Sequence, residues 1–174
     1  MKRLNLKNRI LLFKYPWLRP WGETGFEYTM AFDDMRGWWK AFGKMFCKDV
    51  QKIYYKNPKL YISEIKEKYG RLDIYFGNCR TDDPMLIAHR YEIISQNVCF
   101  KCGKPDVSLT DAGWILPLCK DCYEGKRPYE EVVISEARMN SVVVSGKNES
   151  SEFPKREELA RRIRKEWRKK RNKE

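Results

Sequence analysis

Histidine is nearly absent from this sequence of 174 residues, in which His89 is the only one. A single imidazole excludes a histidine metal triad and leaves little room for acid–base catalysis by histidine. The chain also has no Walker-type phosphate loop, no GxSxG nucleophile elbow and no dinucleotide-binding fingerprint. An enzyme is therefore a minority hypothesis for this protein.

Long apolar stretches are missing as well. No run approaches the roughly 18 to 20 apolar residues of a membrane span. The N-terminal residues carry charges every few positions, and no small-residue cleavage site of a secretory signal follows them. We therefore expect a cytoplasmic protein without a membrane partner.

The chain does have a sizeable apolar fraction and an excess of positive charge. Apolar residues make up 42% and aromatic residues 14%, which is enough for a hydrophobic core. Lys and Arg number 36 against 24 Asp and Glu, a formal charge of +12. Residues 155–174 hold eleven basic and four acidic residues, so this short segment carries +7 of that charge. The rest of the chain is only mildly basic.

Apolar spacing predicts the main helices. Five apolar residues recur at steps of three and four: Trp39, Phe42, Phe46, Val50 and Ile53. This spacing predicts an amphipathic helix over about 34–55. A second helix is expected from about Asp83, where a capping acid precedes Pro84, to Gln96. A shorter helix over 4–15 would be stopped by Pro16.

Residues 60–78 are expected to form a β-hairpin. Leu72, Ile74 and Phe76 alternate with Asp73 and Tyr75, and the chain turns near Gly70. Further along, residues 128–140 fit either a helix or a strand, 142–144 favour a strand, and 145–151 have the composition of a linker.

The segment 15–37 is rich in aromatic residues and is broken by prolines and glycines. We expect an irregular loop that aromatic side chains anchor. Trp17, Trp21 and Trp38 are candidates for a protein interface, because aromatic residues dominate interface hot spots. Burial in the protein's own core is the alternative for these side chains.

Four cysteines give the strongest chemical signal. Cys99 and Cys102 form one CxxC pair, and Cys119 and Cys122 form another after sixteen intervening residues. This spacing is typical of a tetrahedral four-thiolate zinc site, in which each CxxC turn directs two sulfurs at one point. Four protein ligands close the coordination shell, so the zinc would be structural rather than catalytic.

Iron–sulfur binding, a redox dithiol and a metal-free state are the alternatives for these cysteines. Disulfides are not expected, because the cytosol keeps thiols reduced. Cys47 and Cys79 have no partner at ligand spacing, and we expect both to pack in the core.

A few residues fit catalytic roles only weakly. The acidic pairs Asp33-Asp34 and Asp82-Asp83 precede expected helices, where capping explains them. The run Glu64-Ile65-Lys66, with Asp49 as an earlier acid, has the E-x-K form of some metal-dependent nucleases. Such tripeptides are common in a chain this charged.

The basic C-terminal segment is expected to be an amphipathic helix. Leu159, Ile163 and Trp167 form one apolar stripe, with acids near its start and bases near its end. The candidate nucleic-acid-binding residues are Arg161, Arg162, Arg164, Lys165, Trp167, Arg168, Lys169, Lys170 and Arg171. A solvated helix that docks on the body and a helix adsorbed to a membrane surface are the alternatives.

An ordered series of motifs resembles a set of small bacteriophage and mobile-element proteins. The motifs are Lys14-Tyr15-Pro16-Trp17, Glu27-Tyr28-Thr29, Gly37-Trp38, Ala41-Phe42-Gly43, Ile65-Lys66-Glu67-Lys68-Tyr69-Gly70, Cys99-x-x-Cys102-Gly103-Lys104-Pro105, Gly113-Trp114-Ile115 and Cys119-x-x-Cys122. The resemblance covers about residues 12–124 and excludes the basic tail. That set has no settled activity, so the resemblance implies a biological setting and no mechanism.

Together these features predict an α+β fold, in which helices pack with a small β-hairpin and a zinc-ribbon-like four-cysteine module, followed by a basic C-terminal helix. The expected division is a body over 1–98, a zinc module over 99–127 packed on it, a connecting segment and linker over 128–151, and the basic helix over 152–174. We expect a non-enzymatic zinc-binding accessory protein that binds nucleic acid, DNA or RNA, or a host nucleoprotein complex. The alternative is a protein inhibitor of a host defence nuclease, of the anti-CRISPR type, in the host cytoplasm.

Overall fold

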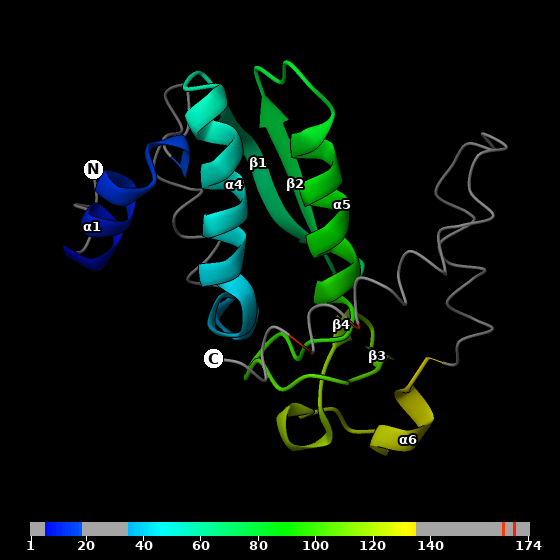
Figure 1. Ribbon diagram of the computed structural model, residues 1–174. Coiled ribbons are helices and arrows are strands. Elements are labelled where there is room, and N and C mark those ends of the chain that lie inside the picture. The colour runs from blue at the N-terminus through cyan, green and yellow to red at the C-terminus, as the bar shows by residue number, and fades with distance from the viewer. Residues whose placement is uncertain (1–5, 19–34, 135–164, 166–168, 170–174) are drawn as a thin grey trace, which may run out of the picture.

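The computed structural model describes residues 6–18 and 35–134, together with residues 165 and 169 (Figure 1). Trp21, the expected strand and linker at 142–151, and most of the expected C-terminal helix therefore lie outside the described residues. The described part combines helices with two small antiparallel sheets, which confirms the α+β class.

The first helix, α1, spans Leu6–Lys14, and a single 3-10 turn, η1, follows at Pro16–Leu18. The helix ends where the sequence predicts, because the proline ring cannot continue it. Leu12 on α1 and Leu18 on η1 are buried, so one side of this N-terminal segment is attached to the core.

The long expected helix is present as three consecutive pieces. They are α3 (Arg36–Trp38), the π-helical turn η2 (Trp39–Gly43) and α4 (Lys44–Lys56). The periodic apolar residues face the core as predicted. The π-helical turn was not predicted, because one extra residue in a turn leaves the apolar spacing nearly unchanged.

The expected hairpin is confirmed. Strands β1 (Tyr61–Lys68) and β2 (Arg71–Gly77) pair antiparallel around a two-residue turn at Tyr69-Gly70. One face carries the buried side chains of Ile62, Ile65, Leu72 and Ile74. The other face carries polar side chains that pair with one another: Glu64, Lys66, Asp73 and Tyr75. Such a sheet packs through one face and meets solvent on the other.

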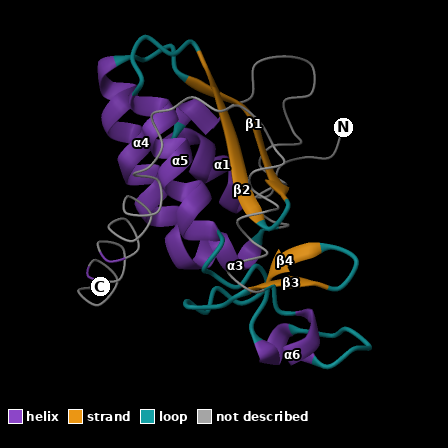
Figure 2. Cartoon of the chain, turned by 90° about the vertical axis from the view of Figure 1, so that its right-hand side faces the viewer, coloured by secondary structure: helices purple, strands orange, loops and turns teal. Residues whose placement is uncertain are grey.

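Helix α5 (Asp83–Ser95) follows the hairpin and begins at the predicted place, with Pro84 in its first turn. Asp82 occupies the N-cap position, but its side chain makes no capping hydrogen bond. Helices α4 and α5 lie side by side across the apolar face of the hairpin, so the body has a helical layer and a sheet layer (Figures 1 and 2).

Two of the three candidate interface tryptophans belong to the core between these layers. Trp17 and Trp38 are each only 1% exposed. The Trp17 indole donates to Gln51 Oε1 at 2.8 Å, and the Trp38 indole donates to the Val98 carbonyl at 2.9 Å. Because both rings and both N–H groups are used internally, the burial alternative applies to them and the interface role does not.

A buried polar pair joins α4 to α5. The Tyr91 hydroxyl, on a fully buried side chain, donates to Asp49 Oδ2 at 2.9 Å. Arg90 and Lys52 approach the same carboxylate at 3.6 and 3.4 Å. Burial, and then the charge of Asp49, raise the pKa of Tyr91 far above its ordinary value. Tyr91 therefore stays protonated and supplies the hydrogen bond that a buried carboxylate requires.

The two cysteines outside the CxxC pairs differ from each other. Cys47 is buried as predicted, and burial raises the pKa of its thiol to about 12. Cys79 is exposed, contrary to the expectation that it packs in the core. The reason is its position, because it follows β2 in the connection to α5, where its thiol contacts the Phe76 carbonyl oxygen at 3.4 Å.

A second, smaller sheet lies beyond α5. Strands β3 (Leu109–Asp111) and β4 (Ile115–Pro117) pair antiparallel, and the turn η3 (Lys120–Cys122) follows them. The ambiguous segment after Pro128 forms a short helix, α6 (Tyr129–Val132), and then extended chain. Its extended end pairs with β3, since the Ile134 N–H donates to the Leu109 carbonyl at 2.8 Å. Residues 128–134 thus pack on the cysteine module.

Among the helices that the structure describes, none combines the length and the apolar character needed to cross a bilayer.

Candidate metal centre

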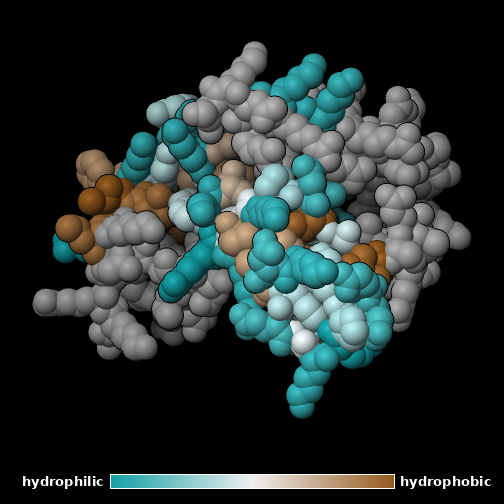
Figure 3. Space-filling view, turned by 90° about the horizontal axis from the view of Figure 1, so that it is seen from below, coloured by the Kyte–Doolittle hydropathy of each residue, from teal (hydrophilic) through white to brown (hydrophobic). Residues whose placement is uncertain are grey.

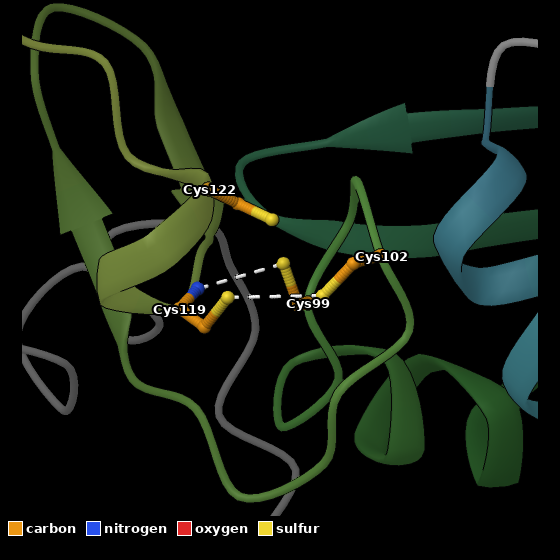
Figure 4. Close-up of side chains that lie close together, drawn as sticks. All are labelled: Cys99, Cys102, Cys119 and Cys122. Atoms are coloured by element: carbon orange, nitrogen blue, oxygen red, sulfur yellow. Dashed lines mark hydrogen bonds between the residues drawn. The ribbon is translucent and has the colours of Figure 1, made fainter.

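The two CxxC pairs come together at one point. The sulfur atoms of Cys99, Cys102, Cys119 and Cys122 all lie within 4.8 Å of one another. Figure 4 shows the four side chains converging from two separate loops. The sequence prediction of a single four-cysteine cluster is confirmed in this respect, and the cluster could hold a metal ion.

The first loop, at Cys99–Gly103, is shaped by its own backbone. The Gly103 N–H donates to the Cys99 carbonyl at 2.9 Å, and the Cys99 N–H donates to the Lys104 carbonyl at 2.8 Å. Gly103 has a φ of +80°, a left-handed conformation that glycine adopts without strain. The Lys104 N–H lies 3.4 Å from the sulfur of Cys102 and donates to it. These bonds form the tight CxxC turn that the cysteine spacing predicts.

The second loop uses a 3-10 turn in place of a left-handed residue. The Cys122 N–H donates to the Cys119 carbonyl at 3.0 Å, which closes η3 and brings the two thiols of this pair to one side. The hairpin β3–β4 carries the chain from the first loop to the second, and the Phe100 N–H donates to the Pro117 carbonyl at 2.8 Å. That bond fixes the two loops against each other.

The distances suit tetrahedral coordination by four thiolates. Sulfurs at about 2.3 Å from a central zinc ion would be about 3.8 Å apart. The sulfurs of Cys102 and Cys119 are 3.7 Å apart. The widest separations in the cluster, up to 4.8 Å, would close by about 1 Å on binding. The residues present therefore fit a tetrahedral metal ion.

The electrostatics of the cluster favour a cation. Burial opposes ionisation of Cys99, but backbone N–H groups, including that of Cys119, donate to its sulfur and the balance lowers its pKa to about 7. Burial, followed by the neighbouring sulfurs, raises the pKa of Cys122, and burial also raises that of Cys119. The Cys99 thiolate therefore forms readily, and ionisation of the thiols beside it is opposed. A bound cation would remove that opposition, because coordination deprotonates thiols.

The body holds the first loop through a very close backbone contact. The Gly37 N–H at the start of α3 donates to the Phe100 carbonyl at 3.0 Å. A Cβ at Gly37 would overlap the carbonyl oxygens of Cys99 and Phe100. A Cβ at Gly103 would come within 2.6 Å of the Gly37 carbonyl oxygen. Two glycines thus allow the helix start and the metal loop to touch through their backbones.

Trp38 packs beside this contact and stabilises it. Its ring meets Phe100 edge-on, with the centroids 5.0 Å apart, and its N–H reaches the Val98 carbonyl next to Cys99. The sequence predicts a possible interface role for Trp38 and no role in the cysteine site for Gly37. Both residues lie far from the CxxC pairs in the sequence. The only sequence signal of close packing at this position is that aromatic residues follow Gly37 directly.

No protein-family model, no curated protein and no solved structure matches this chain.

The lysines around the two loops are engaged with acids. Lys101 lies 2.9 Å from Glu124, Lys104 lies 3.3 Å from Asp121, and Lys120 lies 2.7 Å from Glu130. These three lysines are the basic residues closest to the CxxC pairs in the sequence. Their charges are largely balanced in the structure, although exposed pairs of this kind contribute little to stability. The metal module therefore offers no strongly positive face through these residues.

The catalytic candidates are dispersed. Glu64 pairs with Lys66 at 2.7 Å on the solvent face of the hairpin, whereas Asp49 lies in the helical layer with Tyr91. His89 contacts Glu92 at 3.1 Å, and the other oxygen of Glu92 accepts from Arg71 at 2.9 Å. The E-x-K run and its proposed partner acid thus do not meet in one site.

The candidate nucleic-acid-binding residues of the tail, from Arg161 to Arg171, lie outside the described residues apart from Lys165 and Lys169. Those two residues are helical and exposed.

Proposed function

We propose that the four-cysteine centre binds one zinc ion that stabilises the fold, and that the protein acts by binding rather than by catalysis. The observation that carries this proposal is the convergence of four thiols within 4.8 Å, with no protein ligand position left open. A closed tetrahedral set of sulfurs is the chemistry of structural zinc sites. When bound, zinc would supply the cross-link between the two loops.

The proposed partner is nucleic acid, which the basic C-terminal segment would bind. Residues 155–174 carry +7 of the +12 formal charge, while the lysines around the metal centre are paired with acids. Positive charge in a short segment attracts phosphates with little dependence on sequence. The resemblance of residues 12–124 to phage and mobile-element proteins supports an accessory role in such a setting.

Removal of residues 152–174 tests this proposal. If the segment neutralises around five phosphates of duplex DNA, the logarithm of the affinity should fall with the logarithm of salt concentration at a slope near −4 to −5, and the truncated chain should lose binding. The matched control replaces Lys101, Lys104 and Lys120 by Gln, which removes charge from the metal module and should leave the affinity nearly unchanged. A slope near zero in the full chain would overturn the proposal.

Direct protein binding, as in an inhibitor of a host defence nuclease, is the second candidate function. Leu6, Ile10 and Phe13 lie on one side of α1 and are 70%, 59% and 87% exposed. Figure 3 shows the corresponding apolar surface over α1. Such an exposed apolar stripe is typical of a helix that docks in a groove of a partner.

A capture experiment separates the two candidates. Under the second, Ile10→Asp with Phe13→Asp should abolish capture of a nuclease from host extracts that have been cleared of nucleic acid, and the truncated chain should still capture it. Tyr55→Asp, an equally exposed aromatic position on α4, is the control. Capture that requires residues 152–174 or intact nucleic acid would contradict the second candidate.

A further inference from the structure

The two hairpins that the structure describes meet at one end, and each presents an exposed aromatic ring there. Tyr69 lies in the turn between β1 and β2 and is 63% exposed. Trp114 lies in the turn between β3 and β4 and is 68% exposed. Figure 2 shows the β1–β2 turn beside the small β3–β4 sheet. Neither ring contributes much to the hydrophobic core.

The two turns are held firmly together. The Trp114 indole N–H donates to Glu67 Oε2 at 3.0 Å, and the Gly70 N–H donates to the other oxygen of the same carboxylate at 2.6 Å. Gly70 also packs against the second hairpin, because a Cβ there would come within 2.5 Å of a Leu109 methyl group. Glu67 therefore orients Trp114 relative to the Tyr69-Gly70 turn. Its negative charge is satisfied by two N–H donors.

Tyr69 occupies a position that its backbone does not favour. Its φ is +52° and that of Gly70 is +77°, as in the two-residue turns that prefer Asn-Gly. A bulky side chain in the left-handed region is strained. Because the Tyr69 ring is exposed, burial of the ring does not offset the free energy of this strain. The aromatic ring thus occupies a strained and exposed position, which points to contact with a ligand.

Basic residues lie near the two turns. Lys68 and Arg71 flank the Tyr69-Gly70 turn, where Lys68 is exposed and Arg71 pairs with Glu92 at 2.9 Å. Arg127 reaches the second hairpin, where its guanidinium donates to the Asp111 carbonyl at 2.7 Å. Exposed aromatic rings among basic residues are the chemistry that binds single-stranded nucleic acid, because every base has a face that can stack.

We propose that Tyr69 and Trp114 form a stacking platform for the unpaired bases of single-stranded nucleic acid. The inference rests on the proposed nucleic-acid binding and names its preferred substrate class. The basic segment 155–174 would attract phosphates, and the platform would favour strands whose bases are unpaired. A duplex keeps its bases stacked inside and gains little from exposed rings.

Anisotropy of fluorescein-labelled oligonucleotides tests the platform with the zinc-loaded full chain. The probes are an oligothymidylate, an oligouridylate and a duplex of the same length. Tyr69→Asn and Trp114→Ala should each weaken single-strand binding by about 5- to 150-fold and leave duplex binding nearly unchanged. Tyr69→Phe and Trp114→Phe should retain most of the affinity, because a stacking ring remains. Loss confined to one of the two single strands would assign the platform to DNA or to RNA.

Tyr69→Asn is the most informative variant, because asparagine suits the left-handed turn better than tyrosine does. We expect it to fold with equal or higher thermal stability while it binds less tightly. The control is Tyr55→Ala, which removes an exposed ring from α4 and should not change affinity.

Three results would overturn the inference. Platform variants that bind single strands as tightly as the natural chain would refute the platform and leave the proposed function in place, provided that truncation of 152–174 still abolishes binding. A full chain that binds no oligonucleotide would refute both. Platform variants that lose a captured protein but keep oligonucleotide binding would assign the surface to a protein partner instead.

Discussion

The hydroxyl of Tyr91 is the closest donor to the buried carboxylate of Asp49, at 2.9 Å, and it ties α5 to α4. Removing that oxygen leaves the carboxylate with its more distant cationic neighbours, Arg90 and Lys52. We expect Tyr91→Phe to lower the free energy of unfolding by about 1–3 kcal/mol, since a buried acceptor loses its partner. Urea denaturation measures this change. Tyr55→Phe should shift stability by less than about 0.5 kcal/mol, and equal effects of the two variants would contradict the role of Tyr91.

The six cysteines should differ in reactivity according to their surroundings. Cys79 is exposed, Cys47 is buried with a pKa of about 12, and the other four would be metal-bound. We expect iodoacetamide to modify Cys79 alone in the zinc-loaded protein, and the four clustered cysteines as well after chelation. Mass spectrometry of peptides identifies the modified positions. Modification of the clustered cysteines at the same rate with and without chelator would contradict a bound metal.

At the scale of elements, the junction between α3 and the first metal loop depends on Gly37. A methyl group there would overlap the carbonyl oxygens of Cys99 and Phe100. Gly37→Ala should therefore destabilise the protein by about 1–3 kcal/mol and speed the release of metal to a chelator. Lys40→Ala, at an exposed position on η2, is the control. Wild-type rates of metal release in Gly37→Ala would show that the loop does not depend on this contact.

Some elements followed from local sequence alone. The helix that became α3, η2 and α4 was predictable from its apolar periodicity. The end of α1 and the start of α5 were predictable from Pro16 and Pro84, because a proline acts on the residues next to it. The β1–β2 hairpin was predictable from the alternation of its apolar side chains. The four-cysteine cluster was predictable because two CxxC pairs carry their geometry in their spacing.

Other features depend on contacts between distant residues, which local patterns do not specify. The strands β3 and β4 have only three residues each, too short for a clear alternation of side chains. The burial of Trp17 and Trp38 follows from partners more than thirty residues away. An aromatic residue beside a proline or glycine gives the same local sequence pattern whether its side chain is buried or exposed. The loop prediction therefore could not distinguish core tryptophans from interface tryptophans.

At the scale of the whole molecule, the centre lies at the junction of the body and the metal module. Phe100 packs against the hydrophobic clusters of both parts, and residues 128–134 close the module from the other side. A metal ion at this point would therefore stabilise more than its own two loops. The formal charge of +12 belongs mainly to the segment after this unit, so the proposed binding of phosphates should be separable from the stability of the fold.

Metal content is the most direct test of this account. Protein purified without added metal and analysed by mass spectrometry of the elements should contain about one zinc per chain, and Cys102→Ser or Cys119→Ser should lose the zinc and several kcal/mol of stability. Cys79→Ser is the matched control and should keep both. Protein that carries iron or no metal, or that keeps full stability when Cys102 and Cys119 are replaced, would contradict the structural zinc centre.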